Sequence, residues 1–132
     1  MPLVDINMRT LGDLVVREFS PADGYCREEV TVPAGTYPIG TVVFGTDLGA
    51  TFAKYTAASV ITGNMLAIVI GDHFDVRETF TSTAAAPALV LHRGPLQVSD
   101  FLLKEANGLS DAELAPVIAA LAAQGVDVLK SV

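Results

Sequence analysis

The densest group of side chains that could do chemistry lies in the middle of the sequence. Asp72, His73 and Asp75 are close neighbours, and Glu78 follows shortly after. An imidazole beside carboxylates can bind a metal or share a proton. In a strand, however, Asp72 would face one side while His73, Asp75 and Arg77 faced the other, which splits the ligand set. We therefore interpret this cluster as a solvated turn.

Two further residues have reactive side chains. Cys26 has no histidine beside it, and the charge of Arg27 is cancelled by the glutamates at 28 and 29. A nucleophilic thiol needs an electropositive setting, so we expect Cys26 to pack. Arg93 follows His92 at the end of an apolar run, where we expect it to cap a loop, pair with a carboxylate or contact another subunit.

The composition narrows the function classes. The 132 residues fit one domain, and 51% of them are hydrophobic while only 17% are charged. The net charge of −7 makes nucleic acid an unlikely direct ligand. A lone cysteine excludes an intramolecular disulfide and fits a protein made in a reducing cytoplasm. We identify neither a signal peptide nor a membrane-spanning run, and we expect no membrane partner.

Short β-type runs separated by turns fill the central part of the sequence. We expect strands at residues 25–32, 41–44, 52–55, 65–70, 74–80 and 88–92. The charges of the first suit an edge strand, and the proline and glycine of residues 37–40 disfavour regular pairing. Regular turn spacing without intervening helices favours an antiparallel or irregular β-barrel over βαβ units.

Helical patterns are confined to the last third of the sequence. A short helix is expected within residues 99–106, and a stronger one spans residues 110–124. Ser110 and Glu113 form a capping box, and Gly125 supplies the stop. Pro116 should kink this helix or mark its true start. Residues 126–130 alternate and predict a final strand.

Residues 1–24 are expected to form an N-terminal arm, separate from a β-rich domain at 25–132. The segment shows neither sustained alternation nor a helical stripe, apart from a short apolar run at residues 14–16. It ends in a cluster of turn formers at residues 20–24. Too few self-contacts are expected to offset its ordering entropy. We therefore predict an arm that is mobile in the free protein and orders only against a partner, for instance by adding a strand to a sheet edge.

Several local motifs follow one another in a family order. They are Tyr-Cys-Arg-Glu at residues 25–28, Val-Pro-Ala-Gly at 32–35 leading to Gly-Thr-Val-Val at 40–43, and Asn-Met-Leu-Ala-Ile at 64–68. The tail then has a strand at 89–92, the turn Arg-Gly-Pro at 93–95, a short helix, Leu-Ala-Ala-Gln-Gly at 121–125 and a last strand. From residue 25 to residue 132 the chain resembles the head decoration (capsid-cementing) proteins of lambda-type tailed bacteriophages.

The resemblance implies a mainly β fold of the β-clip or β-tulip type, a small barrel with one or two short C-terminal helices and an extended N-terminal arm. It implies a homotrimer on the outer capsid surface of the virion, at three-fold and quasi-three-fold positions, with an arm that orders against the major capsid protein. It implies no enzymatic activity and no cofactor. The sequence departs from lambda's own protein in its apolar arm and in having no tryptophan.

The expected function is therefore structural. A late virion protein that binds the closed lattice better than free subunits stabilises the shell against internal DNA pressure by mass action, and three joined arms multiply modest contacts. The capsid-binding residues are expected in the arm, and they are Leu14, Val15, Val16, Arg17 and Phe19.

Two other functions remain open. An oligomeric β-barrel binding module could hold a peptide or sugar in a cleft lined by Tyr37, Tyr55 and His92. An enzyme would require Asp72, His73, Asp75 and Glu78 to converge around a metal. We favour neither, and predict no catalytic residue, no metal and no cofactor.

Overall fold

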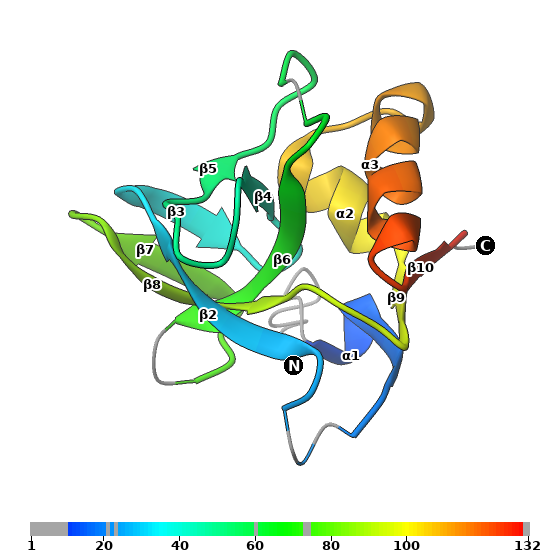
Figure 1. Cartoon of the computed structure of the whole chain (residues 1–132), viewed down its shortest axis with the longest axis horizontal. Helices are drawn as coiled ribbons and strands as arrows, with labels where there is room; N and C mark the ends of the chain where they lie inside the picture. Colours follow the sequence, from blue (N-terminus) through cyan, green and yellow to red (C-terminus); the bar gives the residue numbers. More distant parts are fainter. Residues whose placement is uncertain (1–10, 21, 23, 60, 73–74, 131–132) are drawn as a thin grey trace, which may run out of the picture.

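A computed structural model describes residues 11–20, 22, 24–59, 61–72 and 75–130 (Figure 1). Strands hold 42% of the described residues and helices 23%, so the prediction of a mainly β fold is confirmed. The helices are α1 (Leu11–Leu14), α2 (Asp100–Asn107) and α3 (Asp111–Ala123). The strands are β1 (Val15–Glu18), β2 (Arg27–Val32), β3 (Gly35–Pro38), β4 (Val42–Gly45), β5 (Ala53–Lys54), β6 (Met65–Asp72), β7 (Thr79–Ser82), β8 (Ala86–Leu91), β9 (Leu96–Ser99) and β10 (Val126–Leu129).

The described strands pair into three sheets. The largest has the order β2-β8-β6-β4-β5 and is antiparallel throughout. Strand β2 lies at its edge, as its charges predicted. Strands β3 and β7 form a two-stranded ribbon, and β1-β9-β10 form a mixed sheet.

Strand β6 lies at the centre of two hydrophobic cores. Leu66, Ile68 and Ile70 pack in the first core, while Ala67 and Val69 pack in the second. Successive residues of a strand point to opposite faces, so a strand buried on both faces is apolar at every position. The first core includes side chains of α2, α3 and the β1-β9-β10 sheet, and the second includes the β3–β7 ribbon. The molecule is therefore layered on both sides of its five-stranded sheet.

The two C-terminal helices are confirmed. The hydroxyl of Ser110 accepts a hydrogen bond from the Glu113 N–H, and the Glu113 carboxylate accepts one from the Ser110 N–H. Helix α3 starts before Pro116 and continues through it. The Gln124 amide then accepts from the Leu66 N–H and donates to the carbonyls of Leu66 and His92, which fastens the end of α3 to the large sheet.

Three expectations about the strands are wrong. Gly35–Pro38 pairs regularly with β7, because Pro38 is the last residue of β3 and its missing N–H costs little there. The strand expected over residues 74–80 is described only from Thr79 to Ser82, and residue 74 lies outside the described residues. Before Thr79, Val76 forms only an isolated bridge with Gly71, beside a bend where the Asp72 and Asp75 side chains accept backbone N–H bonds. Strand β9 was not expected, and it pairs in parallel with β10 through an α2–α3 crossover.

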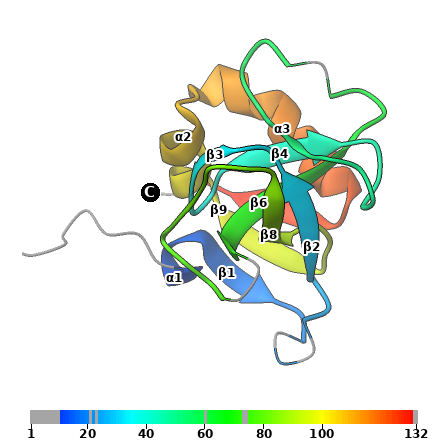
Figure 2. The ribbon, with the colours of Figure 1, turned by 90° about the vertical axis from the view of Figure 1, so that its left-hand side faces the viewer.

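The expectation that the N-terminal segment orders only against a partner is also wrong for residues 11–19. Leu14 is fully buried in the first core, and β1 pairs antiparallel with β9. Figure 2 shows α1 and β1 at the lower end of the molecule, away from α3. The partner strand lies about eighty residues later in the chain, so local self-contacts gave no sign of it. Residues 1–10 lie outside the described part.

Candidate binding face

The β1-β9-β10 sheet has one buried face and one exposed face. Leu96, Val98 and Val126 point into the first core. Their sequence neighbours point the other way, since side chains alternate along a strand. We call this exposed side the outer face, and its residues are Val16, Arg17, Phe19, Gln97, Asp127 and Leu129.

Apolar side chains are unusually exposed on the outer face. Val16 is 57% exposed, Phe19 52% and Leu129 39%. Val16 lies where the β1–β9 register shifts, which is the signature of a β-bulge. Isolated exposed apolar residues are common, and here three of them belong to one three-stranded sheet and its adjoining turn.

A groove of about 660 Å³ crosses one end of this sheet. It lies beside Phe19 and Pro95, and the backbone of Gly94 and Gly125 contributes to its lining. Its polar residues are Arg17, Glu18, Ser20, Gln97 and Asp127. The volume falls in the range of ligand and peptide pockets, and the mixture of apolar and charged groups suits a polypeptide segment.

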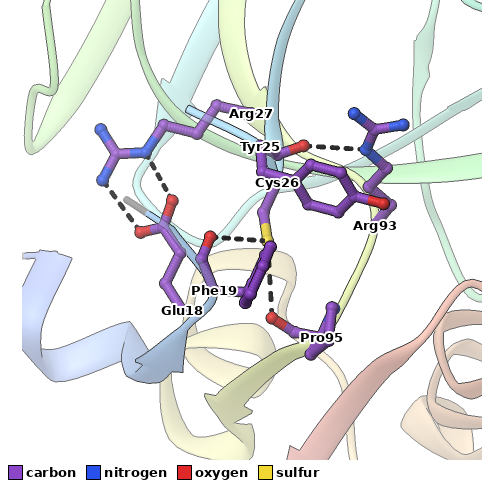
Figure 3. A network of polar contacts seen from close by, with 7 residues as sticks. All are labelled: Glu18, Phe19, Tyr25, Cys26, Arg27, Arg93 and Pro95. Atoms are coloured by element: carbon purple, nitrogen blue, oxygen red, sulfur yellow. Dashed lines mark hydrogen bonds and ion pairs between the residues drawn. The ribbon is translucent and has the colours of Figure 1, made fainter. Parts of the chain in front are cut away.

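Figure 3 shows the contacts that hold the Phe19 end of the outer face. The Phe19 ring meets the Tyr25 ring edge to face, with centroids 5.3 Å apart. The guanidinium of Arg93 lies 4.0 Å from the Tyr25 ring centre, and its Nε donates to the Tyr25 carbonyl. Arg93 therefore caps a loop, as expected, and orients two exposed aromatic rings.

Beneath these rings the fully buried Cys26 thiol lies 3.7 Å from the Phe19 carbonyl and 3.5 Å from that of Pro95, in position to donate to both. Burial raises the pKa of the Cys26 thiol, and the thiol form is a poor nucleophile. The expected packing role of Cys26 is confirmed.

An ion pair fixes β1 to the large sheet. The Arg27 Nε and Nη2 atoms donate to the two Glu18 carboxylate oxygens at 2.9 and 3.0 Å. The Glu18 carboxylate raises the pKa of Arg27, so the pair stays charged. A bidentate pair sets orientation as well as distance, which holds the end of β1 against the start of β2.

No protein-family model, curated protein or solved structure matches this chain. The family resemblance of the sequence therefore stays a prediction. Within the part of the chain that the structure describes, no helix is long and apolar enough to cross a membrane.

The acidic cluster of the sequence does not converge in the described residues. Asp72 forms an ion pair with Arg77, and its carboxylate also accepts the Asp75 N–H. His73 lies outside the described residues. Among those that are described, no group of three histidine, cysteine or acidic side chains could hold a metal.

The three residues expected to line a ligand cleft are buried and separated. Tyr37 stacks on Phe80 in the second core, and its hydroxyl donates to the Pro33 carbonyl. Tyr55 packs in the first core, and His92 is only 7% exposed. Gln97 and Asp127 could not be predicted as site residues from the sequence, because only strand register brings them into one row with Arg17.

His92 makes stability depend on pH. Burial, and then Arg93, lower the pKa of His92, while Glu28 opposes this shift. A histidine whose folded pKa is below its unfolded pKa of about 6.5 loses stability as pH falls through the unfolded value, because the unfolded chain binds the proton first. We expect the urea concentration at the midpoint of unfolding to decrease as the pH is lowered from 7.5 to 5.5. In His92→Gln this dependence of the midpoint on pH should be weaker. Equal slopes in both proteins would contradict this.

Proposed function

We propose that this chain is a structural virion protein that binds the outside of a phage capsid as a homotrimer and stabilises the shell against DNA pressure. The main observation that supports the proposal is the outer face. Val16 lies exposed on the edge strand β1, and Phe19 lies exposed directly after it. The order β1-β9-β10 leaves the second edge of β1 unpaired among the described strands. The resemblance of the sequence to capsid-cementing proteins points the same way.

The docking mechanism differs from that of a free arm. Strand β1 is already held by β9, by Leu14 in the core and by the Glu18–Arg27 pair. A coat-protein segment can therefore add to the free edge of β1 without a large ordering cost on this side. Leu14 then acts as the anchor of β1, Val15 packs against the core, and Val16, Arg17 and Phe19 face the coat.

A direct test mixes the purified protein with empty shells of the phage that encodes it, assembled without it. We expect saturable co-sedimentation, and retention of DNA-filled particles under conditions that burst undecorated ones. Shells that bind none of the protein at micromolar concentrations would contradict the proposal.

We further propose that the trimer contact includes helix α3. From Leu114 to Ala123 this helix has no polar side chain, yet its residues Ala115, Pro116, Ala119, Ala122 and Ala123 are exposed. A helix that is apolar all round is normally buried. In a chain of net charge −7, such an uncharged face also lets copies meet without bringing carboxylates together.

Ala119→Glu is therefore expected to convert the trimer into folded monomers of 13.8 kDa. In the trimer the new carboxylate would be buried without a partner at each interface. In the monomer it would stay in water on an exposed helix position, where glutamate is well tolerated. Sedimentation velocity measures this. The control is Ala57→Glu in the exposed loop after β5, which should leave the trimer intact. A trimeric Ala119→Glu variant would remove α3 from the interface.

A second candidate is a binding module for an extended peptide, and the groove beside Phe19 favours it. The two functions separate in one assay, because only the structural protein should require intact shells for high-affinity binding.

A further inference from the structure

The guanidinium of Arg93 is held in one orientation at the surface. Its central carbon lies over the Tyr25 ring, 4.0 Å from the ring centre, and its Nε donates to the Tyr25 carbonyl at 2.8 Å. The side chain is exposed, so burial does not impose this orientation. A long side chain at a surface usually loses conformational entropy when a partner binds it. For Arg93 much of that loss has already occurred in the free protomer.

The two terminal nitrogens of Arg93 are left for another group. Within the described part of the chain, the only hydrogen bond of this guanidinium is the one from Nε, and it forms no ion pair. Figure 3 shows both terminal nitrogens pointing away from the other residues drawn. Two such donors side by side match the two oxygens of a carboxylate, which they can bind in bidentate geometry.

Other cations of the protein have carboxylate partners. Glu18 accepts from two nitrogens of Arg27, and Asp111 accepts from the ammonium of Lys104. The sequence has 15 acidic residues against 8 basic ones, so an internal partner would be easy to supply. Burial, and then the charge of Arg93, lower the pKa of the adjacent His92, as an unneutralised cation should. A carboxylate for Arg93 can therefore come from outside the protomer.

Arg93 lies beside the residues that we place against the coat. The Tyr25 ring under its guanidinium meets the Phe19 ring, with centroids 5.3 Å apart. Phe19 and Gly94, the residue after Arg93, both line the groove. Side chains two positions apart on an extended segment point to the same side and lie about 7 Å apart. One acidic and one apolar side chain at that spacing can therefore reach Arg93 and Phe19 together.

A single carboxylate fits this position better than a polyanion does. Glu28 and Glu29 are exposed on β2, shortly after Tyr25, and the net charge of the chain is −7. These charges repel the phosphates of a nucleic acid or of an anionic membrane. The side chain of one aspartate or glutamate needs only the local charge of Arg93, because charges further away than a Debye length are screened.

We propose that Arg93 binds an aspartate or glutamate side chain of the coat protein, and that an apolar side chain two positions away in the same coat segment packs on Phe19. This inference rests on the proposed function, and it names the chemistry of the coat segment that docks there. Tyr25 is then a positioning residue, because its ring and its carbonyl fix the guanidinium that the coat carboxylate meets.

Shell binding by three variants of the whole chain tests the contact. Arg93→Gln should weaken binding by up to about a hundredfold, because an exposed ion pair contributes up to about fivefold at one site and three linked sites multiply the loss. Its binding should also depend less on salt than that of the wild type. Arg93→Lys should stay about tenfold weaker than the wild type, since an ammonium cannot replace the planar fork. The control is Arg77→Gln, the same charge change at an exposed arginine that pairs with Asp72, and it should bind like the wild type.

A zero-length cross-link identifies the source of the carboxylate. A carbodiimide joins the new amine of Arg93→Lys to a carboxylate in contact with it, forming an amide. Mass spectrometry of the digested particles then identifies both peptides. We expect the other peptide to carry an aspartate or glutamate of the coat protein. A link from position 93 to a second copy of this chain, or no link from shells that carry the variant, would overturn the proposal.

The outcomes separate this inference from the proposed function. Shells that bind no wild-type protein would contradict both. Shells that bind the wild type and Arg93→Gln equally well, with equal dependence on salt, would overturn the carboxylate contact and leave the shell-binding function standing.

Discussion

Phe19→Asp is expected to lower binding to capsid shells by up to about a thousandfold. The ring is half exposed, and we place it at the centre of the coat contact. A charged side chain there costs roughly tenfold at one site, and three linked sites in a trimer multiply the loss. Co-sedimentation with empty shells over a concentration series measures the effect.

A matched control is Phe101→Asp. The exposed fraction of Phe101, 43%, is similar to that of Phe19, but Phe101 lies on helix α2 and not on the outer face. It should bind shells within about threefold of wild type, since exposed substitutions away from a contact have small effects. If the two variants bound equally well, the outer face would not be the docking surface.

Gly94→Ala is expected to destabilise the fold by about 3 kcal/mol or more, at the upper end of overpacking effects. A Cβ at Gly94 would lie 1.7 Å from the Gly125 carbonyl oxygen and 2.4 Å from its carbon. Gly94 and Gly125 lie in the two segments that lead side by side into the parallel strands β9 and β10. These segments are joined by backbone hydrogen bonds, from the Gly94 N–H to the Gln124 carbonyl and from the Leu96 N–H to the Gly125 carbonyl. Neither chain can yield without losing these bonds.

Urea unfolding separates this effect from the general cost of replacing glycine. In Gly49→Ala the nearest atom to the new Cβ is an Asp47 carboxylate oxygen at 3.4 Å, an ordinary contact. That variant should stay within about 1 kcal/mol of wild type. A Gly94→Ala protein as stable as Gly49→Ala would contradict the close contact between the backbones at Gly94 and Gly125. Both glycines line the groove, so the variant should also lose shell binding.

Local signals were enough for much of the fold. The capping box of Ser110 and Glu113 fixed the start of α3, and the apolar run of β6 between turn formers fixed the central strand. Both depend on residues a few positions apart. The edge position of β2 followed from its charges, for the same reason.

Long-range pairing was beyond the sequence pattern. Strand β1 is stabilised by β9 and by Arg27, and no sequence pattern within residues 15–18 indicates either partner. Local patterns in this segment therefore predict an arm without internal partners. The row of Arg17, Gln97 and Asp127 was missed for the same reason, because it exists only after three distant strands are set in register.

The orientation of the protein on the shell tests the central claim most directly. Electron cryo-microscopy of decorated particles, compared with undecorated ones, measures which surface touches the coat. We predict trimers at three-fold positions with β1 and the ring of Phe19 against a coat-protein strand. Trimers seated with the β1-β9-β10 sheet facing solvent, or shells that acquire no added density, would contradict the account.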